Sequence, residues 1–135
     1  MASELDSKPC PCGHLRDLGS CCGLYLNGQR QAPNPEVLMR SRYTAFALGT
    51  PQALDYLVET HHPLYREPEL RENLQAHFAK PGSWAGLEII RAYEAGDQGV
   101  VEFIAHYEQG GRSDRMHERS EFLREGQRWL YLRGS

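Results

Sequence analysis

Apolar residues recur at helical spacing in the first half of the chain, behind repeated helix-start signals. Met39, Tyr43 and Phe46 lie three and four residues apart, which is the spacing of one face of an α-helix. They follow Asn34-Pro35, an N-cap residue with proline at the first helical position. Thr50-Pro51 repeats this signal before a second set of apolar residues at helical spacing. A third set of apolar residues at helical spacing begins near residue 68. The pattern predicts helices over about 35–48, 51–60 and 68–80.

The period of the apolar positions changes to two in the second half of the chain. Val101, Phe103, Ala105 and Tyr107 occupy alternate positions, which places them on one face of a strand. Glycine-containing turns separate the segments of this kind. They predict strands over about 84–93, 100–108, 113–124 and 129–132. Three helices followed by a four-stranded antiparallel meander form an α+β pattern.

Composition and charge limit the class of function. The chain has 135 residues and a formal net charge of −3, which suits one domain with a small appendage and argues against strong sequence-independent binding of nucleic acid. No apolar run approaches the ~20 residues of a membrane span, and the first residues lack the pattern of a secretory signal. We therefore expect a cytoplasmic protein with no membrane partner.

All four cysteines lie within the first 22 residues, in the pattern C-x-C-x8-C-C. Disulfides within Cys10-x-Cys12 or within Cys21-Cys22 would be strained, because a disulfide needs Cα atoms ~4.4–6.8 Å apart with defined Cβ directions. Four thiolates can instead surround one tetrahedral zinc at ~2.3 Å. The pattern predicts one structural zinc per chain, with a shell closed by sulfur. The alternatives are His14 as a substitute ligand, or a redox pair or free thiols without a metal.

Two sets of motifs resemble known families. Cys-Pro-Cys-Gly, a short spacer and Cys-Cys-Gly resemble the SEC-C zinc motif. Leu38–Phe46 (Leu-Met-Arg-Ser-Arg-Tyr-Thr-Ala-Phe) and His117–Phe122 (His-Glu-Arg-Ser-Glu-Phe), with Tyr25, Gly28 and Trp129-Leu-Tyr, resemble the YchJ-like family of uncharacterised bacterial proteins. The resemblance implies an N-terminal zinc knuckle joined to a nuclear transport factor 2-like domain, a cone of curved sheet and helices.

Domain boundaries and partners follow from the same resemblance. With the polar, proline-broken segment 29–35 as linker, it implies a knuckle over 1–28 and a cone over 36–135. SEC-C motifs suggest docking of a protein or ribosome partner, but their usual basic spacer is missing here, where His14–Ser20 contains both Arg16 and Asp17. Folds of this kind also commonly dimerise through the sheet, which gives a homodimer as a further expectation.

Alternation along the third strand puts polar groups where apolar ones are expected. Glu118 and Ser120 share a face with Phe122, and we expect this face to lie under the helices. A buried carboxylate must be paired or protonated, and Arg40 and Arg42 on the first helix are the partners at hand. One interpretation is therefore a buried Arg–Glu pair that fixes the helix on the sheet.

The other interpretation is a ligand pocket in the mouth of the cone, lined by Arg40, Arg42, Tyr43, Glu118 and Ser120. Glu118 would then be the candidate catalytic acid or base, provided that burial moves its pKa towards neutrality. Three hypotheses for function follow. The chain is a binding protein, whose knuckle docks a partner or whose cone holds a small ligand; or a small-molecule enzyme; or a dimeric scaffold with a filled cone.

The remaining candidate residues receive simpler interpretations. His61-His62 ends the second helix and is interpreted as a surface pair or a charge complement for the helix terminus, with a second metal site as the alternative. His106 and His117 are expected to face solvent, with a proton-transfer pair as the alternative. Trp84 and Trp129 are interpreted as core aromatics.

Overall fold

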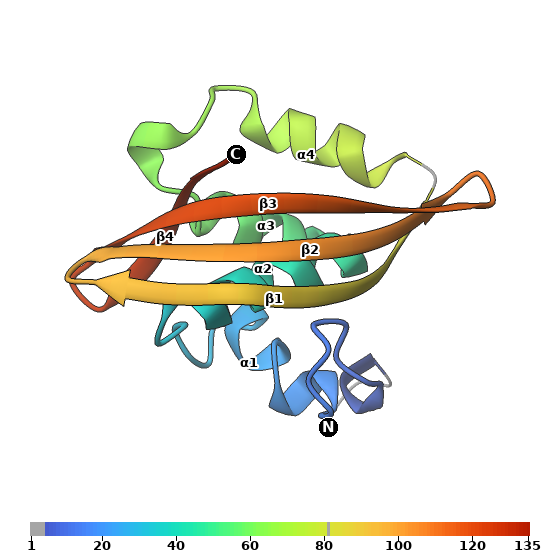
Figure 1. Cartoon of the computed structure of the whole chain (residues 1–135), viewed down its shortest axis with the longest axis horizontal. Coiled ribbons are helices and arrows are strands. Elements are labelled where there is room, and N and C mark those ends of the chain that lie inside the picture. The colour runs from blue at the N-terminus through green and yellow to red at the C-terminus, as the bar shows by residue number, and fades with distance from the viewer. Residues whose placement is uncertain (1–4, 81) are drawn as a thin grey trace.

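The computed structural model describes residues 5–80 and 82–135, and Figure 1 shows their arrangement. The predicted helices are present as α2 (Pro35–Leu48), α3 (Pro51–Glu59) and α4 (Leu70–Phe78). The side chains of Asn34 and Thr50 accept hydrogen bonds from the backbone N–H groups of Val37 and Ala53, at 2.8 and 3.1 Å. Both residues therefore act as the N-caps that the sequence predicts.

Short helical segments make up much of the N-terminal region. They are the 3-10 helices η1 (Leu5–Ser7) and η2 (Leu18–Ser20) and the single turn α1 (Gly23–Leu26), while a further 3-10 helix, η3 (Pro63–Tyr65), lies between α3 and α4. Within the described ranges, no helix has the length and apolar character needed to cross a lipid bilayer.

The second half of the described chain is a four-stranded antiparallel meander in the order β1-β2-β3-β4. Its strands are β1 (Ser83–Ala95), β2 (Gln98–Gln109), β3 (Arg112–Glu125) and β4 (Arg128–Gly134). Helices α2 and α3 lie behind the sheet in Figure 1, while α4 is drawn above β3. On the helix-facing side, Val101 and Phe103 of β2 and Ser120 and Phe122 of β3 are at most 2% exposed. The predicted α+β fold and the predicted faces of β2 and β3 are thus confirmed.

The middle of the cone is filled by side chains. Leu38, Met39 and Tyr43 of α2 pack against Phe103 and Phe122 of the sheet. A second apolar cluster lies among α2, α3 and α4. Its buried members are Leu26, Ala45, Ala53, Leu54, Leu57 and Leu74. The long helix α2 therefore has a core on two sides, which explains why so many of its residues are buried.

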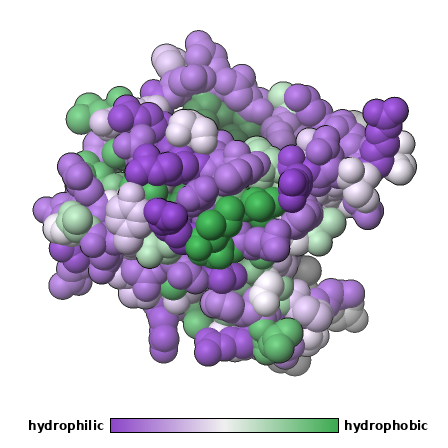
Figure 2. All heavy atoms as spheres, viewed as in Figure 1, coloured by the Kyte–Doolittle hydropathy of each residue, from purple (hydrophilic) through white to green (hydrophobic). Residues whose placement is uncertain are grey.

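The other face of the sheet is turned away from the helices and carries charged pairs. His106 Nε2 lies 2.8 Å from a carboxylate oxygen of Glu88, and His117 Nε2 lies 2.6 Å from one of Glu102. Figure 2 shows a mostly hydrophilic surface on this side, with a hydrophobic patch near its centre. Each histidine is held by a carboxylate of a neighbouring strand, in agreement with the prediction that both face solvent.

The prediction that His61-His62 is a surface pair is wrong. The segment after α3 runs beside β4, where the His62 N–H donates to the Tyr131 carbonyl and the Tyr131 N–H donates to the Thr60 carbonyl, both at 2.8 Å. His62 is only 3% exposed, and both ring nitrogens of His61 are shielded from solvent. Local patterns could not show this pairing, because its partners are about 70 residues apart in the chain.

Candidate metal centre and ligand cavity

The sulfur atoms of Cys10, Cys12, Cys21 and Cys22 all lie within 4.8 Å of one another, and all four residues are buried. Cys12 Sγ is 3.6 Å from both Cys10 Sγ and Cys21 Sγ. A tetrahedral zinc with ~2.3 Å bonds to sulfur requires sulfur–sulfur separations of about 3.8 Å. No two of these cysteines are joined by a disulfide. The cluster is therefore arranged as a four-thiolate metal site.

Glycines allow the knuckle to close around the sulfur atoms. Gly13 has a φ of 94°, a left-handed conformation that suits glycine, and its N–H donates to the Cys10 carbonyl at 3.4 Å. A Cβ on Gly23 would lie 2.6 Å from the carbonyl oxygen of Leu18. Cys22 is the N-cap of α1, so the adjacent pair Cys21-Cys22 lies at the start of a helical turn.

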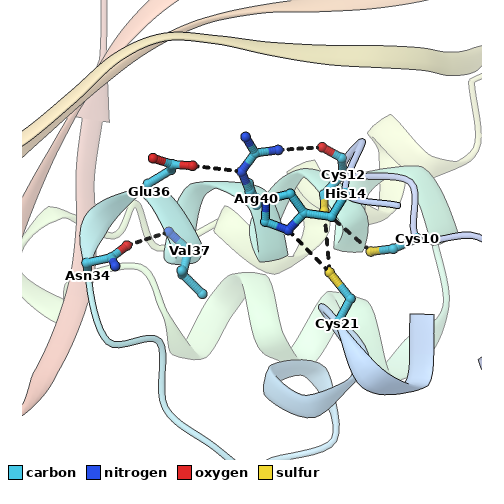
Figure 3. Close-up of polar contacts among 8 residues, drawn as sticks. All are labelled: Cys10, Cys12, His14, Cys21, Asn34, Glu36, Val37 and Arg40. Atoms are coloured by element: carbon cyan, nitrogen blue, oxygen red, sulfur yellow. Dashed lines mark hydrogen bonds and ion pairs between the residues drawn. The ribbon is translucent and has the colours of Figure 1, made fainter. Parts of the chain in front are cut away.

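Helix α2 holds the knuckle from one side, as Figure 3 shows. Arg40 donates from Nη1 to the carbonyl oxygen of Cys12 at 2.7 Å and from Nε to Glu36 at 3.0 Å. Thr44, one turn further along α2, has its hydroxyl 3.7 Å from Cys10 Sγ. His14 Nδ1 lies 3.7 Å from Cys21 Sγ, beside the four-sulfur group. The predicted cone residue Arg40 thus lies at the metal centre.

The close packing of the sulfur atoms shifts the pKa values of three of the thiols. Burial raises the pKa of Cys21 to about 12. Hydrogen bonding to Cys10, and then to Cys12, raises the pKa of Cys22, whereas hydrogen bonds with Cys12 and Cys22 lower that of Cys10. Binding a divalent metal therefore displaces protons from the buried thiols, because metal ligands must be thiolates.

Arg42, Glu118 and Ser120 come together at the α3 end of the cone. Arg42 is buried and donates from Nη1 to the Leu57 carbonyl at 2.9 Å and to Thr60 Oγ1 at 2.6 Å. Burial lowers the pKa of Arg42 to about 10, so this side chain stays charged at neutral pH. Its guanidinium lies 4.4 Å from the centroid of the Tyr131 ring. This stacking supplies part of the stabilisation that a buried cation needs.

Glu118 lies near this cation without touching it. Among the described residues, no ion pair joins Glu118 to Arg42, and Ser120 Oγ donates to Glu118 Oε2 at 3.5 Å. A Cβ on Gly134 would collide with the Glu118 carboxyl group, so the end of β4 covers this carboxyl. Burial raises the pKa of Glu118, against smaller opposing effects of Ser120 and Arg42. The site is a covered acid beside a buried cation.

Tyr43 lies apart from this group. Its hydroxyl accepts a hydrogen bond from the N–H of Gly86 at 3.0 Å, and its ring meets Trp84 edge-on at 5.8 Å. The structure thus brings Arg42, Glu118 and Ser120 together and places Arg40 and Tyr43 elsewhere. As ligand-binding or catalytic residues, all five stay predictions.

A cavity of about 620 Å³ lies at the opposite end of the cone, where α2 and α4 end and β1 begins. The end of α4 and the start of β1 lie at the right in Figure 1. The wall of the cavity includes Phe46, Phe78, Trp84 and Tyr107, whose rings form a chain of edge-on and tilted contacts with 5.8–6.4 Å between centroids. Glu118 is not part of its lining.

Sequence reasoning missed this cavity. Periodicity predicts Phe46 on the apolar face of a helix and Trp84 in the core, but it does not distinguish a packed aromatic from one that faces a cavity. The available signal was the concentration of rings at the C-terminal ends of two helices and the start of the following strand.

Comparison with known proteins settles the family. The family model described as "YchJ, middle NTF2-like domain" matches residues 34–134. A "UPF0225 protein" from Chromobacterium violaceum is 47% identical over 130 residues, which are 93% of this chain and 90% of the relative. The chain belongs to the YchJ-like family. The predicted nuclear transport factor 2-like fold is confirmed with it.

Solved structures extend the likeness of this YchJ-like chain to the knuckle. The solution structure of a SEC-C motif containing protein from Rhodopseudomonas palustris has a TM-score of 0.84 and 37% identity, over 94% of this chain and 97% of that one. It supports the assignment of the cysteine cluster as a SEC-C motif, which is a metal-binding motif.

Two further structures share the fold alone. A sec-c motif containing protein from Psychrobacter arcticus has a TM-score of 0.80 at 23% identity, over 96% of this chain and 82% of that one. A putative calcium/calmodulin-dependent protein kinase type II association domain from Thiobacillus denitrificans has a TM-score of 0.58 at 15% identity, over 78% of this chain and 94% of that one.

Proposed function

We propose that this YchJ-like protein binds a small ligand in the aromatic cavity and is stabilised by one structural zinc ion in the knuckle. The cavity carries the proposal, because its volume of about 620 Å³ falls within the roughly 300–1,000 Å³ of small-molecule sites. Its lining combines four aromatic rings with the charged side chains of Lys80, Glu108 and Arg115, and small-molecule sites likewise combine apolar walls with polar groups that orient the ligand.

A neutral aromatic probe tests the cavity. We expect 2-naphthol to raise the melting temperature and to shift the indole N–H resonance of Trp84, which lines the cavity, while that of Trp129, which is 2% exposed in the core, stays in place. Ala47→Phe should fill the cavity and abolish both effects. Ala76→Phe, at an exposed position of α4 outside the lining, should leave them intact. A protein that does not respond to the probe, or an equal response in both variants, would exclude the cavity.

Zinc is proposed as the metal because a closed tetrahedral set of four thiolates suits it and leaves no position for substrate. Metal analysis of purified protein should find about one zinc per chain, and Cys21→Ser should lower that content. A tetrahedral four-sulfur site can also hold iron, in which case the protein would be coloured. The unbonded thiols also suit a reducing compartment, which supports the cytoplasm as location.

Partner docking through the knuckle is a second candidate function. Leu15 is fully exposed in the knuckle loop, and an adjacent groove of about 360 Å³ is lined by Arg16, Arg30 and Arg40. Arg30 thus adds positive charge from outside the spacer beside Arg16, whereas the charge of Arg40 is already paired with Glu36, and this favours an acidic segment of a protein partner. A polyglutamate peptide should shift knuckle resonances, and Arg16→Glu with Arg30→Glu should abolish the shifts; unchanged shifts would remove this candidate.

The other hypotheses have less support. Glu118 has the raised pKa that an acid or base needs, but β4 covers it and it does not line the cavity. The proposal therefore gives Glu118 no contact with the ligand. A homodimer through the open face of the sheet would have to cover exposed Ile90 and Tyr93, and sedimentation analysis tests it directly.

A further inference from the structure

The two sides of the cavity differ in chemical character. The wall is formed by Phe46 of α2, Phe78 of α4 and Trp84 of β1, with Tyr107 of β2 beside them. Gly49, in the left-handed conformation with a φ of 61°, lets α2 end close to the Phe78 ring. A flat apolar or aromatic body fits such a wall, because aromatic rings stack offset or meet edge to face.

The rim carries more positive than negative charge. Lys80 follows α4, Arg115 lies on β3, and Glu108 lies on β2. Within residues 5–80 and 82–135, none of these three side chains forms an ion pair with another residue. Elsewhere on the sheet some charged side chains do form pairs, as Arg133 does with Glu121. The rim of the cavity therefore carries two cations without an ion-pair partner in the described part of the chain, Lys80 and Arg115, and one carboxylate, Glu108.

His77 adds no charge to the rim at neutral pH. Burial lowers the pKa of His77, and the nearby charge of Lys80 lowers it further. The C-terminal ends of α2 and α4 also point towards the cavity, and the partial negative charge of a helix C-terminus favours cations. Some carbonyl groups of the last helical turns already accept hydrogen bonds, since the N–H groups of Gly49 and Ala79 donate to the carbonyls of Ala45 and Gln75. Full charges on Lys80 and Arg115 outweigh these partial ones.

We infer that the cavity takes a flat, aromatic or apolar molecule with one anionic group, and that Lys80 and Arg115 bind that group. This inference rests on the proposed function and names the ligand class for the same site. A carboxylate can accept hydrogen bonds from the Arg115 guanidinium in a fork geometry and from the Lys80 ammonium as a point charge. The ring of the ligand would then lie against Trp84.

Three probes that share one ring system test the inference. We expect 2-naphthoate to bind at least about tenfold more tightly than neutral 2-naphthol, measured by calorimetry at pH 7 and low salt. A naphthyl trimethylammonium probe should bind most weakly. The preference for 2-naphthoate should shrink in 0.5 M salt, because the rim cations are exposed and therefore screened.

Substitutions of the rim residues test whether Lys80 and Arg115 cause the preference for 2-naphthoate. Lys80→Gln and Arg115→Gln should each reduce the affinity for 2-naphthoate by about three- to tenfold and leave 2-naphthol unchanged. Arg112→Gln, on the same strand as Arg115 but outside the lining, should change neither affinity. Because all three positions are exposed, the variants should fold normally, which the retained binding of 2-naphthol verifies.

The outcomes separate the inference from the proposed function. Equal affinities for 2-naphthoate and 2-naphthol would overturn the anionic preference and leave the cavity as a binding site. Preference for the cationic probe would also overturn it and would assign the selectivity to Glu108 and the helix ends. Binding of none of the probes would reject the proposed function itself.

Discussion

Arg40 Nη1 donates a hydrogen bond of 2.7 Å to the backbone carbonyl oxygen of Cys12, so a side chain of α2 holds a residue that the spacing predicts as a metal ligand. Arg40 belongs to the helical motif that carries the YchJ-like resemblance, and only 16% of its side chain is exposed. The motif therefore includes a structural link between the helix and the metal centre.

The first prediction concerns this link. Arg40→Ala should lower the free energy of unfolding by about 1–2 kcal/mol, since it leaves a buried carbonyl without a charged donor, and should speed metal release to a chelator. Glu36→Gln removes only the partly exposed ion pair with Arg40 and should cost no more than about 0.5 kcal/mol. Urea denaturation of the metal-loaded protein measures both. Equal costs would show that the bond to Cys12 contributes nothing.

The second prediction concerns close backbone approach in the knuckle. Gly23→Ala would place a Cβ 2.6 Å from the Leu18 carbonyl oxygen, and because backbone must move, we expect a clear loss of bound metal. Gly28→Ala meets open space, but its φ is 81°, which costs about 1–2 kcal/mol without loss of metal. Metal analysis of the two variants decides; full metal content in Gly23→Ala would contradict the packing described above.

The third prediction concerns His61 and pH. Burial, and then the charge of Arg42, lower the pKa of His61 from 6.5 to about 4. Between these values the unfolded chain binds more protons, so stability is lost as the pH falls from 6.5 to 4. Because His61 as a residue is only partly buried, we expect a loss of about 1–2 kcal/mol rather than the full value of the shift.

His61→Phe should remove this part of the pH dependence. The measurement is the free energy of unfolding at pH 7 and pH 4.5 for the wild type, His61→Phe and His106→Phe. The exposed-face variant His106→Phe should retain the loss of stability that His61 causes. If His61→Phe follows the same curve as the wild type, His61 is not the titrating group.

The fourth prediction separates the two interpretations of Glu118. Burial raises the pKa of Glu118, so the folded state holds the proton of this carboxyl group more tightly than the unfolded state does. The free energy of unfolding therefore falls as the pH rises from the unfolded to the folded pKa of Glu118. Glu118→Gln should therefore gain stability relative to the wild type between pH 4 and pH 7. Glu121→Gln, which loses an ion pair with Arg133, should not. A Glu118→Gln protein that is less stable at pH 7 would show that Arg42 needs the carboxylate as a counter-ion.

The sequence predicted the parts of the fold that depend on neighbouring residues. Asn34 and Thr50 were recognisable as caps because capping is a local hydrogen bond, and the buried face of β3 followed from alternation through Ser120 and Phe122. The cysteines could be assigned to a metal site for the same reason, since Cys10 and Cys12 are two residues apart. Each of these inferences needs only a few consecutive residues.

Features that depend on distant segments were not predictable in this way. The cavity exists because Phe46, Phe78 and Trp84 come from three elements and do not fill the space between them. The burial of His62 depends on backbone pairing with Tyr131, and the position of Arg40 depends on where the knuckle packs on α2. Periodicity predicts that a residue is buried, but it does not identify the residue that it contacts.

The place of the knuckle beside the sheet has a consequence for handling the protein. Gly13 lies close to the carbonyl oxygen of Leu87 on β1, which is an edge strand, and Figure 1 shows the N-terminal loop next to that strand. Unprotected edge strands readily pair with other chains. Chelating agents in purification buffers would therefore do more than unfold the knuckle. They would expose the edge of β1 to pairing with other copies of the chain, and the demetallated protein would precipitate before the cone itself unfolds.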